Sequence, residues 1–247
     1  MQDRVVLVTG GSRGIGRAIG LRFAEEGSKV FINFFQDREA AESTARQIAD
    51  RGAEVYPFQA DLKDPEQIRA MFREIRSRFG RVDVLVHNAA SGVLRPALDL
   101  TAKHWDWVMA TNARSLLLCA REAAAAMPSG GRIISLSSLG SERVIPQYAA
   151  IGVSKAALES LTRYLAVELA SRGIAVNTVS AGAVATEIWD LIPEGQQILE
   201  RIRERTPSGR LVTPDDVAEI VYFLASPQAQ MIQGQVIVLD GGYSLIA

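Results

Sequence analysis

The sequence predicts an α/β protein with one doubly wound parallel sheet of about seven strands and helices on both of its faces. Short apolar runs recur along the chain, and most are followed by a longer segment with the polarity pattern of a helix. Glycine and proline mark many of the boundaries between these segments. No linker, repeat or low-complexity tract divides the chain, so residues 1–247 are predicted to form a single domain.

The composition is that of an ordinary globular protein, with 48% hydrophobic and 22% charged residues and a net charge of −1. Balanced charge gives no general attraction to nucleic acid, and no apolar run approaches the ~20 residues of a membrane-spanning helix. The single cysteine, Cys119, excludes an internal disulfide. The first predicted strand starts a few residues after Met1 and leaves no room for a signal peptide. We therefore expect a cytoplasmic protein with no nucleic-acid partner, no membrane partner and no metal site.

The first strand and helix carry a glycine motif. Residues 4–9 (RVVLVT) form a continuous apolar run, as expected of a buried parallel strand, and a helix pattern follows the glycines as far as Glu26. Glycines between such a strand and helix give a tight turn and let the backbone approach a pyrophosphate at the helix N-terminus. This arrangement predicts a Rossmann-type dinucleotide site. Its candidate residues are Gly10, Ser12, Arg13, Gly14, Ile15 and Gly16.

The end of the second strand, residues 29–35, favours NADPH over NADH. An acidic residue usually binds the adenine ribose there when the cofactor is NAD, but this chain has Gln36 and no carboxylate until Asp37. Arg13 and Arg38 are available for a 2′-phosphate. Other readings of these residues stay open. Arg38 can instead be a solvated charge at a helix start. Asp37 can be a helix N-cap or a ligand of NAD.

The remaining elements follow from periodicity and from start and stop signals. Asp64 and Pro65 open one helix and Gly80 closes it, and Thr213 begins another. Residues 187–210 are polar and poorly anchored, as expected of a lid over a substrate. The predicted helices are 37–50, 64–80, 101–127, 156–170 and the one after Thr213, and the further strands are 55–60, 82–86, 132–136, 174–179 and 235–240.

One segment concentrates groups that handle protons. Ser138 follows a predicted strand, and Tyr148 and Lys155 stand near the start of a predicted helix. Seven residues of α-helix advance ~700° and ~10.5 Å, so the phenol and the amine return to nearly the same face. Parallel sheets bind ligands at the carboxyl ends of their strands, which makes this segment the predicted catalytic site.

The segment resembles the catalytic region of short-chain dehydrogenases/reductases, with one departure. Most members have the tyrosine four residues before the lysine, where this chain has Ile151. The spacing of Tyr148 and Lys155 resembles that of the enoyl-acyl-carrier-protein reductases of this superfamily. Residues 93–112 (VLRPALDLTAKHWDWVMATN) are similar to the type III enzymes, the FabL type. The resemblance covers the full chain.

The resemblance implies further cofactor contacts. Asp61 and Leu62 match a pair that borders the adenine, and Lys155 matches the lysine that holds the nicotinamide ribose. Asn88 matches an asparagine that lines the cofactor, whereas the neighbouring His87 replaces another asparagine and is expected to be structural rather than catalytic. The other residues expected at the cofactor are Ala89 and Thr186.

The resemblance also implies an activity: NADPH-dependent reduction of the C2=C3 bond of trans-2-enoyl thioesters in fatty-acid biosynthesis. Tyr148 would hydrogen-bond the thioester oxygen. Ser138 matches a serine that bonds a substrate carbonyl, although a role in lining the pocket stays open. The expected substrate is bound to acyl-carrier protein or CoA, and the expected assembly is a homotetramer. Two alternatives remain, a carbonyl or 3-oxoacyl reductase acting on a small ketone or quinone, and a nucleotide-binding regulator without catalysis.

Overall fold

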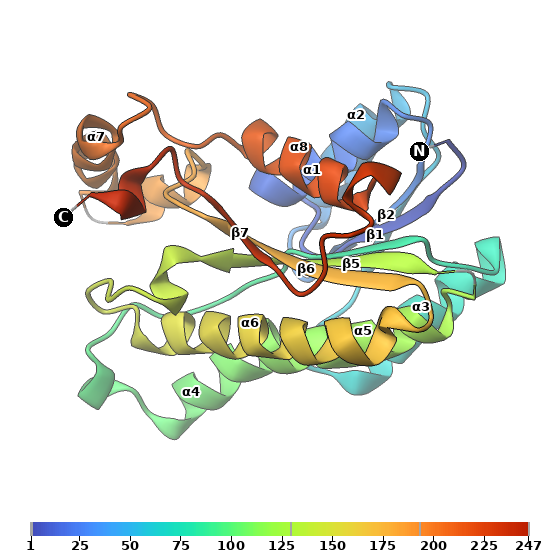
Figure 1. The fold of residues 1–247 in the computed structure, drawn as a ribbon, viewed down its shortest axis with the longest axis horizontal. Helices are drawn as coiled ribbons and strands as arrows, with labels where there is room; N and C mark the ends of the chain where they lie inside the picture. The colour runs from blue at the N-terminus through green and yellow to red at the C-terminus, as the bar shows by residue number, and fades with distance from the viewer. Residues whose placement is uncertain (1, 129, 193, 247) are drawn as a thin grey trace.

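The computed structural model describes residues 2–128, 130–192 and 194–246 and confirms the predicted fold class. Seven parallel strands form one sheet in the order β3-β2-β1-β4-β5-β6-β7, as Figure 1 shows in ribbon form. The order reverses between β1 and β4, so a crevice opens at the carboxyl ends of these two strands. The strands are β1 (Val5–Val8), β2 (Lys29–Phe34), β3 (Val55–Gln59), β4 (Val84–His87), β5 (Gly131–Ser138), β6 (Ile174–Ala181) and β7 (Val236–Leu239).

Helices cover both faces of the sheet. In Figure 1, α1, α2 and α8 lie above the sheet, and α3, α5 and α6 lie below it. Alternate residues of each strand contribute to the hydrophobic cores on the two faces, because successive side chains of a strand point to opposite faces. The helices are α1 (Gly14–Ala24), α2 (Arg38–Ala49), α3 (Pro65–Phe79), α4 (Ala102–Met109), α5 (Ser115–Ala125), α6 (Ala149–Ala170), α7 (Gly195–Arg205) and α8 (Pro214–Ala225).

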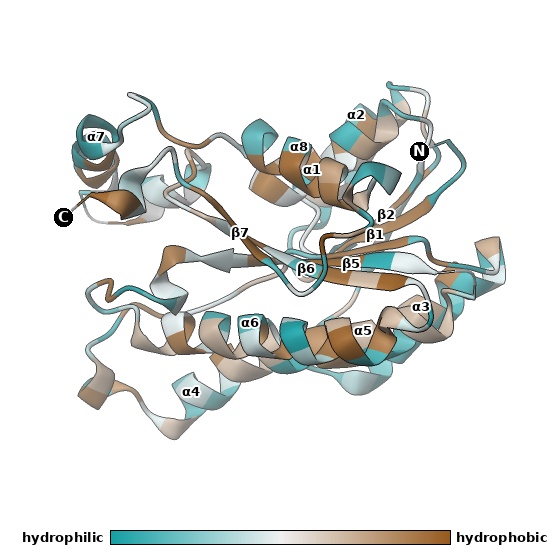
Figure 2. Cartoon of the chain, in the orientation of Figure 1, coloured by the Kyte–Doolittle hydropathy of each residue, from teal (hydrophilic) through white to brown (hydrophobic). Residues whose placement is uncertain are grey.

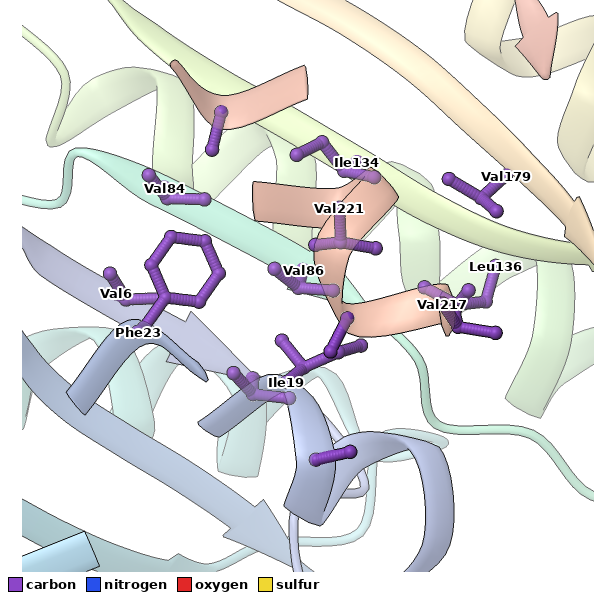
Figure 3. Packing of buried hydrophobic residues seen from close by; sticks show 14 of the residues in the cluster. Val6, Ile19, Phe23, Val84, Val86, Ile134, Leu136, Val179, Val217 and Val221 are labelled. Carbon is purple, nitrogen blue, oxygen red and sulfur yellow. The ribbon is translucent and has the colours of Figure 1, made fainter. Parts of the chain in front are cut away.

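The core under α1 and α8 shows this packing. Ile19 and Phe23 of α1, together with Val221 of α8, are fully buried against alternate residues of the strands. Figure 3 shows their side chains meeting Val6, Val84, Val86, Ile134 and Val179. In Figure 2 hydrophobic residues follow the central strands, and hydrophilic ones are frequent on α2 and α7 at the periphery. Burial of aliphatic side chains on both faces explains why the strands are continuous apolar runs.

Local start and stop signals act as predicted. The Asp64 side chain accepts a hydrogen bond from the backbone N–H of Glu66 at the start of α3. Gly80 ends that helix in the left-handed region, with φ of 70°. Thr213 and Asp216 form a reciprocal capping box at α8. These caps depend on residues close in sequence, which is why the sequence reveals them.

The predicted start of the catalytic helix is wrong. Helix α6 begins at Ala149, seven residues before the expected start at Ala156, so Lys155 lies inside the helix rather than at its beginning. A Cβ on Gly152 would come within 2.5 Å of the carbonyl oxygen of Gly140. The first turns of α6 therefore pack closely on the segment after β5, and this tertiary contact outweighs the low helix propensity of glycine.

Candidate active site

The glycine motif forms an open helix N-terminus at the crevice. Gly10 and Gly14 have φ of 62° and 52°, values that favour glycine. A Cβ on Gly16 would lie 2.2 Å from the carbonyl oxygen of Gly10, so only glycine permits this approach of α1 to the loop. No side chain caps α1 at Arg13, which leaves the first backbone N–H groups available to an anion. The geometry fits a pyrophosphate.

Ser12 and Ile15 take part in this loop in different ways. The carbonyl of Ser12 accepts a 2.7 Å hydrogen bond from the Thr44 hydroxyl, which anchors the loop to α2. Ile15 is half-buried and packs against the core on the α1 side of the sheet. Their backbone therefore lies in the turn that would surround a phosphate, while the Ile15 side chain belongs to the core.

Three further residues hold the loop in shape. The Asn88 amide donates 3.0 Å hydrogen bonds to the carbonyls of Thr9 and Gly10. The Thr9 hydroxyl accepts hydrogen bonds from the backbone N–H groups of Asn88 and Ala89. The buried Asn33 amide donates to the carbonyl of Ala60, while its oxygen accepts from the Gly10 N–H at 3.4 Å. Asn88 thus braces the nucleotide loop, and the bracing roles of Thr9 and Asn33 were not predicted from the sequence.

The two arginines predicted to bind a 2′-phosphate lie near the carboxyl end of β2. The exposed Arg13 guanidinium is 3.8 Å from the Asp37 carboxylate. Asp37 also accepts a hydrogen bond from the Ala40 N–H, which makes it the N-cap of α2. Arg38 donates to Gln59 at 3.0 Å, and Gln36 beside it is exposed. Asp37 is therefore a helix cap, one of the alternatives left open by the sequence, and both guanidinium groups lie at this edge.

Of the two residues predicted to lie at the cofactor after β3, Asp61 is partly exposed and the side chain of Leu62 is buried. Asp61 accepts a hydrogen bond from the Lys63 N–H and lies 3.2 Å from the Lys63 ammonium. Leu62 is buried in the core on the other side of the sheet, so only its backbone faces the crevice. The Lys63 ammonium also stands 5.6 Å from the ring centre of Phe35, which is 48% exposed. Lys63 and Phe35 are additional candidates that sequence reasoning missed.

Two of the predicted catalytic residues, Ser138 and Tyr148, lie close together at the end of β5. A Cβ on Gly140 would lie 2.6 Å from the Tyr148 ring, so this ring rests directly on the Gly140 backbone. Burial raises the pKa of Tyr148, and a hydrogen bond with the Ser138 side chain opposes that rise. Ser138 is therefore a direct neighbour of the phenol. Its hydroxyl also accepts a bond from the Gly140 N–H at 3.3 Å.

A tight turn fixes the phenol from the other side. Gln147 has φ of 61°, in the left-handed region that non-glycine residues rarely adopt. Its carbonyl accepts a 2.8 Å hydrogen bond from the Arg95 N–H, which joins this turn to the loop after β4. Backbone outliers of this kind cluster at functional sites. Tyr148, the next residue, directly precedes α6.

Lys155 is buried two turns into α6, and its side chain reaches strand β5. Its ammonium donates a 2.7 Å hydrogen bond to the carbonyl of Leu136, and the residue is only 5% exposed. Burial lowers the pKa of Lys155 to about 8, and the negative charge of Glu159 opposes this change. The amine therefore titrates near physiological pH.

Ile151 occupies the usual tyrosine position without facing open space. A Cβ on Gly92 would fall 2.2 Å from Cγ1 of Ile151, so the branched side chain lies on the Gly92 backbone. Asn112 fastens the same region: its amide donates to the carbonyl of Ser91 and to the hydroxyl of Ser154, both at 2.9 Å. Asn112 lies in a π-helical turn, residues 110–114, between α4 and α5.

His87 is a structural residue in its contacts. It is 1% exposed, and its Nε2 lies 2.7 Å from the Ser115 hydroxyl. Burial first, and then the charge of Lys155, lowers the pKa of His87 to about 3. The imidazole is therefore neutral at physiological pH, which agrees with the structural role that the sequence favoured.

The segment proposed as a lid stands at the carboxyl end of the sheet beside the C-terminus (Figure 1). A cavity of about 300 Å³ separates it from the start of α1. Thr186 faces the glycine loop across 3.6 Å, measured from a Cβ built on Gly14. Arg17 of α1 and Glu187 form an ion pair of 3.6 Å. A larger hollow of about 460 Å³ lies between α1 and α8, near Arg4 at the opposite ends of the strands.

The described part of the chain shows neither a metal site nor a membrane-spanning helix. Within residues 2–128, 130–192 and 194–246, no group of His, Cys, Asp and Glu side chains is arranged to hold a metal ion. No helix in these ranges has the length and apolar character needed to cross a membrane. The arrangement at the crevice is typical of dehydrogenases that use a nicotinamide dinucleotide.

Comparisons with known proteins identify the family. The model of the family "Enoyl-(Acyl carrier protein) reductase" matches residues 10–244. The chain is 38% identical to 1-cyclohexenylcarbonyl-CoA reductase of Streptomyces collinus, over 99% of this chain and 88% of that protein. It is also 38% identical to the 3-oxoacyl-[acyl-carrier-protein] reductase FabG of Staphylococcus aureus, over 96% of each.

Solved structures of related reductases and dehydrogenases have the same fold. Levodione reductase is 31% identical, with a TM-score of 0.95 and full coverage of both chains. The acetoin dehydrogenase YohF of Salmonella typhimurium is 32% identical, with a TM-score of 0.89 over 100% of this chain and 99% of that one. The chain belongs to the short-chain dehydrogenase/reductase superfamily. It is an oxidoreductase that uses a nicotinamide nucleotide.

Proposed function

We propose that the protein is an NADPH-dependent enoyl-thioester reductase acting on trans-2-enoyl groups carried by acyl-carrier protein or CoA in fatty-acid biosynthesis. One observation carries the proposal: the phenol at the end of β5 is Tyr148, seated on Gly140 beside Ser138, while position 151 holds an isoleucine packed on Gly92. In ketone reduction the oxygen is bonded to the carbon that accepts hydride. In enoyl-thioester reduction the charge develops on the C1 oxygen, two bonds further away, which suits a displaced phenol.

The residues present fit the nicotinamide dinucleotide, because Gly16 lets α1 approach Gly10 closely and no side chain caps the N-terminus of α1, which leaves its backbone N–H groups to a phosphate. When bound, the reduced nicotinamide supplies the hydride that C3 of the substrate accepts. Tyr148 hydrogen-bonds the thioester oxygen and stabilises the enolate, and Ser138 orients the phenol. A proton from Tyr148 or from water then reaches C2 and completes the reduction. Lys155 holds the nicotinamide ribose, and its positive charge makes the phenol a stronger hydrogen-bond donor.

Relatives support two substrate classes. The name of 1-cyclohexenylcarbonyl-CoA reductase specifies an unsaturated thioester, and that of FabG specifies a 3-oxoacyl thioester on acyl-carrier protein. Reduction of a 3-oxoacyl thioester or another ketone is our alternative function. The proximity of Ser138 to Tyr148 favours it, since such a pair can also bind a ketone oxygen. A regulator without catalysis is less well supported, because the chain keeps both the phenol and a buried lysine.

A substrate comparison tests the proposal. Purified protein is assayed for NADPH oxidation with a crotonyl thioester, an acetoacetyl thioester, a diketone, and no substrate. We expect the crotonyl thioester to give the highest kcat/KM. A higher value for the acetoacetyl thioester or the diketone would establish the ketone-reducing alternative. Saturable NADPH binding without turnover of any substrate would instead support the regulator.

Cofactor preference gives a second test. Arg13→Ala is expected to weaken NADPH binding ~10-fold or more and to change NADH binding less than twofold, because the exposed guanidinium at the end of β2 faces the 2′-phosphate. Fluorescence titration of both cofactors measures the difference. Arg46→Ala, an exposed arginine further along α2, is the matched control and should leave both affinities unchanged. Equal affinities of the wild-type protein for NADPH and NADH would contradict the assignment.

Helices α5 and α6 support the proposed homotetramer. They expose large apolar side chains that neither core buries, and homo-oligomers pair such patches across two-fold axes. We expect light scattering at micromolar concentration to give four times the 26.8 kDa chain mass. A monomer would contradict this proposal. We also propose that the protein is cytoplasmic. The exposed residues are Leu117, Val153, Tyr164 and Val167.

A further inference from the structure

A buried carboxylate lies under the proposed catalytic site. Glu159 is on α6, one helical turn beyond Lys155, and only 4% of its surface is exposed. Carboxylates are rarely buried to this extent unless another group satisfies them. The Ser137 hydroxyl donates a short hydrogen bond to Glu159, and Ser137 directly precedes Ser138. Neither the motif nor the mechanism proposed above uses this acid.

Lys155 and Glu159 hold neighbouring residues of β5. The Lys155 ammonium donates to the carbonyl of Leu136, and Glu159 accepts from the side chain of Ser137. No ion pair within 4.0 Å joins the two charges among the described residues. Residues four apart on a helix are nonetheless close, with Cβ atoms about 6 Å apart. The carboxylate therefore acts on the ammonium through space without occupying its hydrogen-bonding positions.

Few other charges face Lys155. Tyr148, just before α6, is neutral at physiological pH because burial raises the pKa of its phenol. On β4, His87 is buried beside it and neutral. Strand β6 has no ionisable side chain, and β5 has only Arg132 at its amino end. In the π-helical turn, Arg114 is exposed and donates to the carbonyl of Lys63. The remaining ionisable groups on the helices beside α6 are Lys103, His104 and Asp106 of α4 and Cys119, Arg121 and Glu122 of α5, of which only Cys119 is buried.

We propose that Glu159 is a positioning residue that keeps the Lys155 ammonium charged while leaving it free for the cofactor, and that orients Ser138 through Ser137. The inference rests on the proposed catalytic role of Tyr148 and Lys155, and it holds for an enoyl or a ketone substrate alike. Burial alone disfavours the charged amine, and the Glu159 carboxylate offsets this effect. A direct ion pair would hold the ammonium away from the ribose.

The first test reads Lys155 directly in the protein without cofactor. The chain has four lysines, at positions 29, 63, 103 and 155, so selective ¹³Cε-lysine labelling gives few NMR signals, and Lys155→Met assigns the one of interest. Glu159→Gln is expected to lower the titration midpoint of Lys155 by about one pH unit or more. Glu159→Leu removes the same charge and fills the same buried space, so it should give the same shift if the glutamine variant does not fold.

The control is Glu168→Gln, an exposed acid further along α6, which should leave the Lys155 midpoint unchanged. Glu159→Asp keeps the charge and should return the midpoint toward the wild-type value. A midpoint in folded Glu159→Gln or Glu159→Leu equal to that of the wild type overturns the proposal. This measurement needs no substrate, so its outcome is independent of whether the enoyl-reductase assignment is correct.

The second test is the pH dependence of NADPH affinity and of kcat/KM. In Glu159→Gln both should decline at lower pH than in the wild type, with kcat/KM returning to within about twofold of wild type near pH 6. Removing the negative charge destabilises the charged amine, which therefore loses its proton at lower pH. A residue that only supports packing would lower kcat/KM equally at every pH. That parallel loss would also overturn the proposal.

Discussion

Tyr148→Phe is expected to lower kcat for an enoyl thioester ~10²-fold or more, with NADPH affinity changed less than twofold. Removal of one donor to a developing oxyanion typically costs ~3–4 kcal/mol of transition-state stabilisation. The ring itself should keep its place, because it rests on the Gly140 backbone and the substitution removes only the hydroxyl. Steady-state kinetics with a crotonyl thioester and fluorescence titration of NADPH measure the two quantities.

Tyr164→Phe is the matched control for this variant. Tyr164 is on the same helix, is 68% exposed, and lies four turns from the start of α6. It should retain wild-type kcat. Near-wild-type enoyl reduction by Tyr148→Phe would contradict the assignment of Tyr148 as the catalytic phenol and would require another donor near Ser138.

The second large effect concerns the choice between enoyl and ketone substrates. Ile151→Tyr should raise the ratio of ketone to enoyl turnover, and Tyr148→Phe/Ile151→Tyr should raise it about tenfold or more. A phenol at position 151 would donate a proton beside the carbon that accepts hydride, and a positioned general acid contributes 10²–10⁴-fold in general. The expected shift is smaller, because Ile151 packs on Gly92 and the larger ring must turn away from that backbone.

Ile151→Phe separates the hydroxyl from the size of the ring. It introduces the same aromatic volume without a donor, so it should lower both turnover rates and leave their ratio unchanged. Kinetics with a crotonyl and an acetoacetyl thioester at saturating NADPH give the ratio for each variant. If the folded double variant binds NADPH but loses both activities in parallel, position 151 does not determine the substrate class.

The position of Ser138 beside Tyr148 matters for both enoyl and ketone reduction. The sequence left open whether Ser138 bonds a substrate carbonyl or merely lines the pocket, because Tyr148 stands three residues before the usual tyrosine position, 151. The structure places the Ser138 side chain close enough to Tyr148 to oppose the rise in the phenol pKa that burial causes. We therefore expect Ser138 to influence the phenol with either an enoyl or a ketone substrate.

The sequence by itself determined the features that depend on neighbouring residues. Strand β1 and the glycine turn are contiguous, so the dinucleotide site follows from spacing and from the need for glycine at Gly10 and Gly14. The helix boundaries at Asp64 and Gly80 follow from local capping chemistry. Alternating strands and helices imply a parallel sheet, because a parallel connection requires a crossover.

Tertiary structure decided the features that join distant residues. The early start of α6 results from the approach of Gly152 to Gly140, and no local pattern encodes that contact. The Asn88 side chain, expected at the cofactor, is bonded to the nucleotide loop 78 residues earlier in the chain. Burial of Leu62 likewise depends on helices that pack later against its face of the sheet.

Tertiary structure also determined which charged side chains are buried. Glu159 looks in sequence like any acidic residue of a helix, and only the packing of α6 on β5 removes it from water and sets it beside Ser137. The shifted pKa of Lys155 has the same origin, since desolvation depends on what surrounds a side chain and not on its neighbours in the chain. Residue types and spacing therefore identified the chemical groups of the site, whereas packing between distant segments set their charge states and contacts.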